Sequence, residues 1–318
     1  MTIQFMEPLN RAWNRMKSAL FRPLDLHKWF VIGFNAFLAG LMDAANGSGG
    51  FRGSKDFRFG EFLHFPETAW NWLTNNPWWG FAILFAAVVA IVVILLLAWV
   101  GSRGVFMFLD NVVHDRVEVA RPWKEYRKEG NSLFLWRLVF GLLCLVIFGG
   151  LLALFFIQGA ALYDAGLGRT LPWAFILGIG LPALLLVFVS GFIILFLKDF
   201  VAALQFKSRI SAAEAWRLFL RLFSQYPFPF LGYGILIFVL MLLFVFVVIV
   251  AGLITCCIGW LLLVIPYVGT VVTLPFWYWL RAFSLEFLAQ FGPEYDVFPR
   301  PAAPAPAAPV GTAPQAGM

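Results

Sequence analysis

The chain has 318 residues, of which 62% are apolar and only 13% are charged, and its mean hydropathy is +0.85. Soluble domains carry roughly 45–50% apolar and about 25% charged residues, so this composition excludes a soluble globular enzyme. The formal net charge is +6, from 23 Lys and Arg against 17 Asp and Glu. The composition predicts an all-α integral membrane protein with several spans.

Runs without Asp, Glu, Lys or Arg divide the chain into candidate membrane-spanning helices. The longest run has 59 residues, 222–280, and as one helix it would be roughly 89 Å long against a hydrocarbon core of about 30 Å. It must therefore cross, turn and cross again. Together with the shorter runs it predicts six spans in three hairpins, near 26–43, 80–101, 136–158, 173–197, 228–250 and 260–282.

The distribution of Lys and Arg predicts which side of the membrane each segment faces. If the six spans alternate, 19 of the 23 basic residues lie on the face that holds both termini. Because basic residues stay cytoplasmic, both termini are predicted inside, in a plasma membrane. The first span has only 14 charge-free residues, a length that suits a core or re-entrant segment equally, and the charge asymmetry favours a crossing. The basic residues are dispersed over three inner segments, which predicts no nucleic-acid partner.

Three inner segments share an apolar helical face, and each precedes a predicted hairpin. Equal offsets relate Leu9–Leu20 to Ala212–Phe223, and 119–126 repeats the pattern in part. Ser211 and Glu214 form a capping box at the start of the third such helix. We interpret the unit as a threefold repeat of an interfacial amphipathic helix, although unrelated basic juxtamembrane helices would show the same pattern. The basic residues expected to contact lipid headgroups are Arg11, Arg15, Lys17, Lys124, Arg217 and Arg221.

No spacing of reactive residues predicts catalysis, a metal site or a cofactor. The three histidines fall on different predicted segments, and Cys144 lies inside an apolar span. The adjacent pair Cys256–Cys257 lacks the C-x-x-C spacing of a redox or zinc site. One outer loop gathers several candidate cation ligands, which we expect to be solvated instead: Asp56, Glu61, His64 and Glu67.

Charged residues cluster near the inner ends of the predicted spans, and none lies at mid-span. Charge at mid-bilayer usually marks proton relays or intramembrane catalysis, so its absence argues against both functions. Those expected to snorkel to the interface are Arg103, Arg137, Lys198, Asp199, Arg281 and Glu286. Asp110 and Asp115 lie beyond the second span, where we expect a solvated helical extension.

The last predicted span contains a potential break. Proline and glycine close together interrupt the helical hydrogen-bond ladder, and broken spans of transporters expose groups that bind substrates or ions. The candidate site at this break consists of Pro266, Tyr267, Gly269, Thr270 and Thr273. The alternative is that Pro266 only closes an outer turn before a regular last helix.

Residues 1–292 form the predicted transmembrane domain, and residues 293–318 form a disordered cytoplasmic tail rich in proline and alanine. Two stretches carry a resemblance: LFRPLDLHKWFVIG at 20–33 and LRAFSLEFLAQFGPEYDVF at 280–298. They resemble a family of uncharacterised bacterial multi-pass inner-membrane proteins of unknown function. More remotely, the architecture is similar to the membrane domain of glycerophosphodiester phosphodiesterases. The resemblance implies a bacterial inner-membrane location and no mechanism, since we expect no soluble phosphodiesterase domain here.

These observations favour a non-enzymatic membrane protein that binds lipid or partner subunits at the cytoplasmic leaflet. The expected partners are membrane lipids, a second copy of the chain or other membrane subunits. Basic helices gain about 1 kcal/mol per Lys or Arg near an anionic leaflet. The alternative function is a transporter or channel for an uncharged or lipidic solute. A mostly apolar cavity would favour the first function, and a water-lined one the second.

Overall fold

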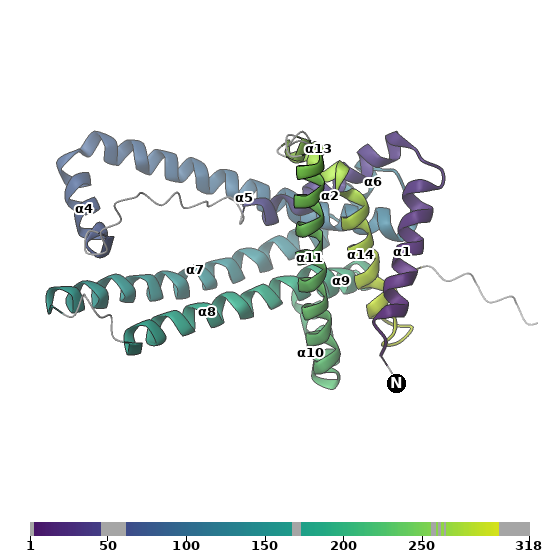
Figure 1. Ribbon diagram of the computed structural model, residues 1–318. Coiled ribbons are helices and arrows are strands. Elements are labelled where there is room, and N and C mark those ends of the chain that lie inside the picture. The colour runs from purple at the N-terminus through teal and green to yellow at the C-terminus, as the bar shows by residue number, and fades with distance from the viewer. Residues whose placement is uncertain are drawn as a thin grey trace, which may run out of the picture.

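The computed structural model describes residues 3–45, 62–166, 173–255 and 265–298, together with Gly259, Leu262 and Leu263. These residues form helices and no strand. In Figure 1 three long helices lie side by side and project to the left: α5 (Pro77–His114), α7 (Arg127–Asp164) and α8 (Trp173–Phe196). Their right-hand ends enter a cluster of helices that we call the body.

The body contains the shorter helices and the last part of α5, Ala98–His114. Its members are α1 (Met6–Phe21), α2 (Leu26–Ala45), α6 (Ala120–Glu125), α9 (Ala202–Ser208), α10 (Ala212–Gln225), α13 (Pro266–Val272) and α14 (Leu274–Ala289). A π-helical turn, η2 (Leu197–Val201), joins α8 to α9 within it. Helix α4 (Phe65–Asn75) lies at the opposite end of α5 (Figure 1).

Four helices of the described chain are long and apolar enough to cross a membrane: α5, α7, the stretch Leu177–Ser208 and α11 (Pro227–Ile254). They coincide with the predicted spans from the second to the fifth. In Figure 1, α11 runs across the direction of α5, α7 and α8, so the four do not form a simple parallel bundle. The predicted arrangement of six spans in three hairpins is not confirmed.

The first predicted span, 26–43, forms α2, which packs antiparallel along the body part of α5. Lys28 pairs with Asp115 at 2.8 Å, and the Asn35 amide donates to Asn111 at 2.6 Å. Leu38 lies so close to Gly104 that a Cβ added there would be 2.6 Å from the Leu38 backbone carbon. Helix α2 therefore covers the end of α5 beyond its exposed apolar stretch.

Helix α5 has two halves of different character, which explains its length. Its 38 residues extend about 57 Å, nearly twice the hydrocarbon thickness. Side chains before Ala98 are mostly exposed and apolar, whereas those from Gly101 to Val113 are buried. Trp79 and Trp99 bracket the exposed half about 30 Å apart along the helix. Exposed apolar surface of this extent is typical of contact with lipid.

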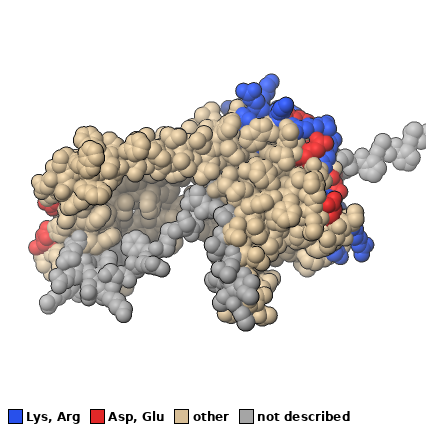
Figure 2. All heavy atoms as spheres, turned by 90° about the horizontal axis from the view of Figure 1, so that it is seen from above, with Lys and Arg blue, Asp and Glu red and all other residues tan. Residues whose placement is uncertain are grey.

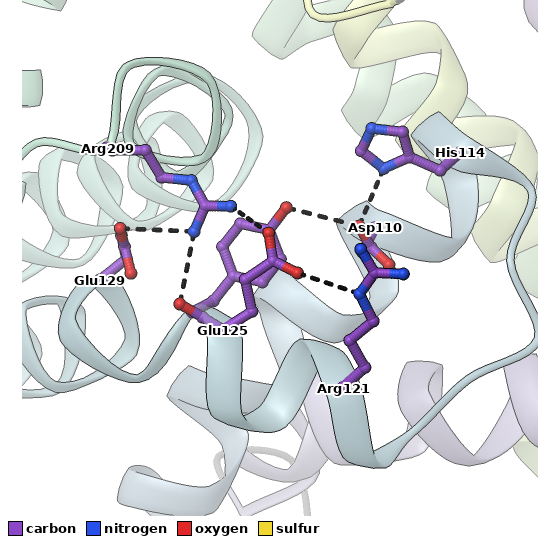
Figure 3. A network of polar contacts seen from close by, with 7 residues as sticks. Asp110, His114, Arg121, Glu125, Glu129 and Arg209 are labelled. Atoms are coloured by element: carbon purple, nitrogen blue, oxygen red, sulfur yellow. Dashed lines mark hydrogen bonds and ion pairs between the residues drawn. The ribbon is translucent and has the colours of Figure 1, made fainter.

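The buried half of α5 corrects the prediction of a solvated extension at Asp110. This side chain is only 2% exposed and accepts from the Tyr126 hydroxyl at 3.4 Å, while His114 lies 2.8 Å from the same oxygen. Arg209 stacks on Tyr126, with 3.9 Å to the ring centroid, and pairs with Glu125 at 2.5 Å (Figure 3). Burial and the Asp110 charge raise the pKa of the Tyr126 phenol. The network ties α5, α6, α7 and α9 together.

Charged side chains gather on the body, where Figure 2 shows the Lys and Arg residues at one end of the molecule. The two ends of the described chain also meet there. The Gln4 backbone amide donates to the Gln290 side chain at 3.0 Å, and the Gln290 amide donates back to the Gln4 carbonyl at 2.9 Å. Helices α1 and α14 pack together, with Trp13 edge-on to Trp279.

The predicted helices at 9–20 and 212–223 form α1 and α10, and both pack on protein. Ala12, Met16 and Leu20 are buried in the body, as are Ala215 and Phe219. The capping box of α10 is confirmed: the Glu214 amide donates to Ser211 Oγ at 3.3 Å, and the Ser211 amide donates to the Glu214 carboxylate at 2.9 Å. Because their apolar faces are covered by protein, these helices offer mainly their polar faces to other partners.

Several predictions concern residues outside the described chain: most of the predicted tail, Cys256, Cys257, Asp56 and Glu61. The first residues of the predicted tail, 293–298, pack on the body. Lys207 donates to the Pro293 carbonyl at 2.7 Å, and the Arg15 guanidinium lies 3.5 Å from the Phe298 ring centroid.

Candidate functional site

A cavity of about 590 Å³ lies where α2, α5, η2, α11, α13 and α14 meet. Its volume falls within the range of roughly 300–1,000 Å³ that small-molecule sites occupy. Most lining side chains are apolar, including Phe37, Phe108 and Met241. The polar lining residues are Lys198, Asp199, Thr270, Thr273 and Arg281.

The charged wall of the cavity is built on the π-helical turn η2, which carries Lys198 and Asp199. Such turns recur at functional sites because they break the regular spacing of side chains. Arg281 of α14, only 4% exposed, lies 3.5 Å from Asp199 and donates to the Lys198 carbonyl at 2.6 Å. The Tyr233 hydroxyl of α11 donates to the other Asp199 oxygen at 2.9 Å.

This wall carries two cations and one carboxylate, so its formal charge is +1. Lys198 Nζ also lies 5.7 Å from the centroid of the Trp277 ring, within the range of a cation–π interaction. A buried ion pair stabilises a fold weakly, because desolvation offsets the Coulombic attraction, yet removing one partner is costly. The ion pair therefore holds Arg281 and Asp199 in place, and the wall presents two cationic side chains, Lys198 and Arg281, to a mostly apolar cavity.

The last predicted span is interrupted between α13 and α14, at Thr273, whereas Pro266 and Gly269, where the break was predicted, lie within α13. The backbone at the interruption remains hydrogen-bonded. The Thr273 amide donates to the Gly269 carbonyl at 3.0 Å, and the Trp277 amide donates to the Thr273 carbonyl at 3.3 Å. Thr273 Oγ1 donates to the Gly269 carbonyl at 2.8 Å and accepts from the Trp277 indole at 3.0 Å. Thr273 therefore lines the cavity with its side chain, whereas the backbone groups named here are already hydrogen-bonded within the protein.

The structure divides the predicted broken-helix site. Gly269, Thr270 and Thr273 line the cavity, and Gly269 is needed because a Cβ there would come within 2.7 Å of the Leu263 carbonyl oxygen. Tyr267 lies elsewhere: its hydroxyl donates to the Phe30 carbonyl at 2.9 Å. Pro266 is the first residue of α13. A backbone N–H at this position has no partner within the helix, so a proline there costs no hydrogen bond.

The predicted headgroup residues are spread over α1, α6 and α10, and none of the six lines the cavity. Five of them are exposed: Arg11, Lys17, Lys124, Arg217 and Arg221. Arg11 pairs with Glu7 on its own helix. Arg15 is instead engaged with the protein, because it pairs with the buried Glu286 at 2.9 Å.

The prediction that the inner-end charges snorkel is wrong for four residues, which are buried in the body: Arg103, Asp199, Arg281 and Glu286. Sequence reasoning missed the pairing of Asp199 with Arg281 because the two are 82 residues apart. Asp199 lies in η2 and Arg281 lies in α14, so no local sequence pattern links the two residues. Among the described residues, no group of three or more His, Cys, Asp or Glu side chains could hold a metal ion.

Comparison with known proteins gives a family without a known activity. The model of a family of unknown function, DUF7544, matches residues 4–274. No curated protein and no solved structure matches the chain. The matched region includes the candidate spans and most of the cavity, and it ends at the first residue of α14. The chain belongs to this family of unknown function.

Proposed function

We propose that the protein is a non-enzymatic membrane protein that binds a lipidic amphiphile in the cavity at the cytoplasmic leaflet. The observation that carries the proposal is the combination of apolar lining with one cationic wall, formed by Lys198 and Arg281 around Asp199. An acyl chain fits the apolar part, and an anionic or strongly polar end group fits the wall. Apolar sites with a few convergent polar groups typically bind ligands that these groups orient by one polar end.

The membrane setting of this proposal is a bacterial inner membrane with the body on the cytoplasmic side. The Lys and Arg residues on the body support this orientation (Figure 2). The contact between Gln4 and Gln290 supports both termini on that side. Single cysteines in place of Glu67 on α4 and Ser224 on α10, in a cysteine-free background, test the orientation. A membrane-impermeant maleimide should label position 67 in intact cells and position 224 only after permeabilisation; the reverse contradicts the orientation.

A binding role fits the cavity better than an aqueous pathway does. Its few polar lining groups are paired: Asp199 with Tyr233 and Arg281, and Thr273 with Trp277. Carboxylates engaged in this way serve poorly as general bases, because their lone pairs are already occupied. Transport of a lipidic solute is the second candidate function, favoured by the helix break at Thr273 in the cavity wall.

Filling the cavity tests the proposal. Gly40 lines the cavity, and a Cβ added there meets no atom within 4 Å, so Gly40→Leu adds a side chain beside the cavity with its Cβ in open space. The matched control is Gly141→Leu on the exposed face of α7, where a Cβ also meets no atom within 4 Å. Native mass spectrometry of protein purified in mild detergent, followed by lipid extraction, counts and identifies retained amphiphile.

We expect the wild type and Gly141→Leu to retain an acyl-chain amphiphile, and Gly40→Leu to lose at least 90% of it, about a tenfold reduction. Equal retention in Gly40→Leu contradicts the cavity as the binding site. The retained molecule should keep its mass during incubation, whereas a hydrolysed product contradicts the non-enzymatic assignment. Reconstituted liposomes should show no flux of a fluorescent acyl amphiphile; protein-dependent flux would favour the transport alternative.

A further inference from the structure

A second cationic site lies where α5 and α7 leave the apolar stretch and enter the body. Trp99 marks the inner end of the exposed half of α5, at the depth where tryptophans gather in membranes. Arg103 follows one helical turn later. From the facing helix, Arg137 Nη1 donates to Ser102 Oγ at 3.3 Å. Arg103 of α5 and Arg137 of α7 therefore each form a hydrogen bond across the contact between the two helices, close to Trp99 in the sequence of α5 or facing it from α7.

Arg103 has unusual surroundings for a buried cation. It is 7% exposed and is held between two indoles, with 4.2 Å to the Trp99 centroid and 4.9 Å to the Trp123 centroid. Its Nη2 donates to Asn131 at 3.0 Å, while its buried Nε has no hydrogen-bond partner. Among the described residues, no carboxylate forms an ion pair with it.

Close packing fixes Arg103 in this position. A Cβ added at Gly130 of α7 would come within 2.8 Å of Arg103 Cγ, so the helices approach at the arginine stem. Arg127 on the same helix adds a like charge near it. The acidic residues of this region are engaged elsewhere, since Glu125 and Glu129 both pair with Arg209 (Figure 3).

We propose that Arg103 and Arg137, with Trp99 and Trp123 beside them, bind the phosphate of an anionic glycerophospholipid. A buried cation without a carboxylate favours an anionic ligand, because desolvation otherwise penalises its charge. Guanidinium groups match phosphate oxygens in geometry and charge. The site rests on the proposed function only for its orientation in the membrane, and its ligand is separate from the amphiphile of the cavity.

Delipidated protein in a neutral detergent, titrated with phosphatidylglycerol or phosphatidylcholine, tests this site. Native mass spectrometry counts the bound copies. We expect one phosphatidylglycerol to bind at least tenfold more tightly than phosphatidylcholine, and Arg137→Gln to remove most of that preference. Arg103→Lys should weaken binding as well, because an ammonium group lacks the planar guanidinium fork. If Arg103→Lys fails to fold, Arg137→Gln alone decides the test.

The matched control is a double variant, Arg217→Gln with Arg221→Gln, which removes two exposed charges from α10. The account predicts that it keeps the preference for phosphatidylglycerol within about twofold. If the control and Arg137→Gln lose the preference for phosphatidylglycerol equally, the proposal is overturned, because the lipid is then attracted to the basic surface as a whole. Inorganic phosphate is the third probe: if millimolar phosphate binds but phosphatidylglycerol does not, the lipid assignment is overturned.

The two ligand sites are distinguishable in one experiment. Arg137→Gln should retain the cavity amphiphile, and Gly40→Leu should retain phosphatidylglycerol. Loss of phosphatidylglycerol in Gly40→Leu contradicts an independent site at Arg103. If the cavity retains no amphiphile, the preference of the wild type for phosphatidylglycerol still decides whether this second site exists.

Discussion

Replacement of Gly104 by alanine tests the packing that sets α2 against the buried half of α5. The added Cβ would lie 2.6 Å from both the Leu38 carbonyl carbon and its Cβ, and 2.7 Å from the Ala39 nitrogen. Carbon atoms prefer separations of about 3.5–4.0 Å, so the α2 backbone has to move by about 1 Å. Overpacking of this kind costs about 1–3 kcal/mol. The rigid backbone at this contact favours the upper part of that range.

The matched control is Gly141→Ala, on the exposed face of α7, where the new Cβ meets no atom within 4 Å. Both variants gain the helix propensity of alanine, about 1 kcal/mol over glycine, so their difference isolates the packing cost. Thermal unfolding of the purified protein in detergent, followed by tryptophan fluorescence, should place Gly104→Ala several degrees below Gly141→Ala. Equal melting temperatures would refute the close contact between α2 and α5.

Three further predictions concern the buried ion pair and the α10 cap. Arg281→Met alone should destabilise the protein by about 3–5 kcal/mol, because it removes the guanidinium that pairs with the buried Asp199. Adding Asp199→Leu should recover most of that loss, measured by thermal unfolding. If the double variant recovers no stability, the two residues are not coupled. Ser211→Ala should cost about 1 kcal/mol through loss of the helix cap, against no measurable cost for the exposed Ser224→Ala. Hydrogen bonds from Ser211 lower the pKa of Glu214. The cap should therefore stabilise α10 fully at pH values above the ordinary pKa of glutamate, and this stabilisation should be lost as the pH falls through the lowered pKa of Glu214. Carboxyl carbon shifts of Glu214 should follow that titration in the wild type. In Ser211→Ala the pKa should move part of the way toward the ordinary value, because the backbone amide of residue 211 still donates to the carboxylate.

The candidate spans were predictable because the membrane imposes a simple rule on composition. The predicted segments 80–101, 136–158, 173–197 and 228–250 fall within helices that are long and apolar enough to cross it. The rule says nothing about where a helix ends after it leaves lipid. Helix α5 continues to His114 because the body covers it. That cover comes from α2 and α14, which lie far away in sequence, and from α6, which directly follows α5.

The capping box of α10 was predictable because Ser211 and Glu214 act within one helical turn. The charged wall was not, because Asp199, Tyr233 and Arg281 come from separate helices and no local pattern records their pairing. Sequence alone identified Gly269, Thr270 and Thr273 because it predicted a break at Pro266–Gly269, although Gly269 and Thr270 lie within α13. It included Tyr267 for the same reason, although this side chain packs against α2.

Photocrosslinking of the bound amphiphile tests the central claim, that the cavity holds a lipidic ligand, most directly. The wild-type protein in liposomes is incubated with a fatty acid that carries a diazirine on its chain, irradiated, and digested for peptide mass spectrometry. The account predicts crosslinks on the cavity segments 36–40 and 270–277, reduced about tenfold or more in Gly40→Leu and unchanged in Gly141→Leu. Crosslinks confined to the exposed faces of α5, α7 and α8, with none in the cavity, would contradict the claim.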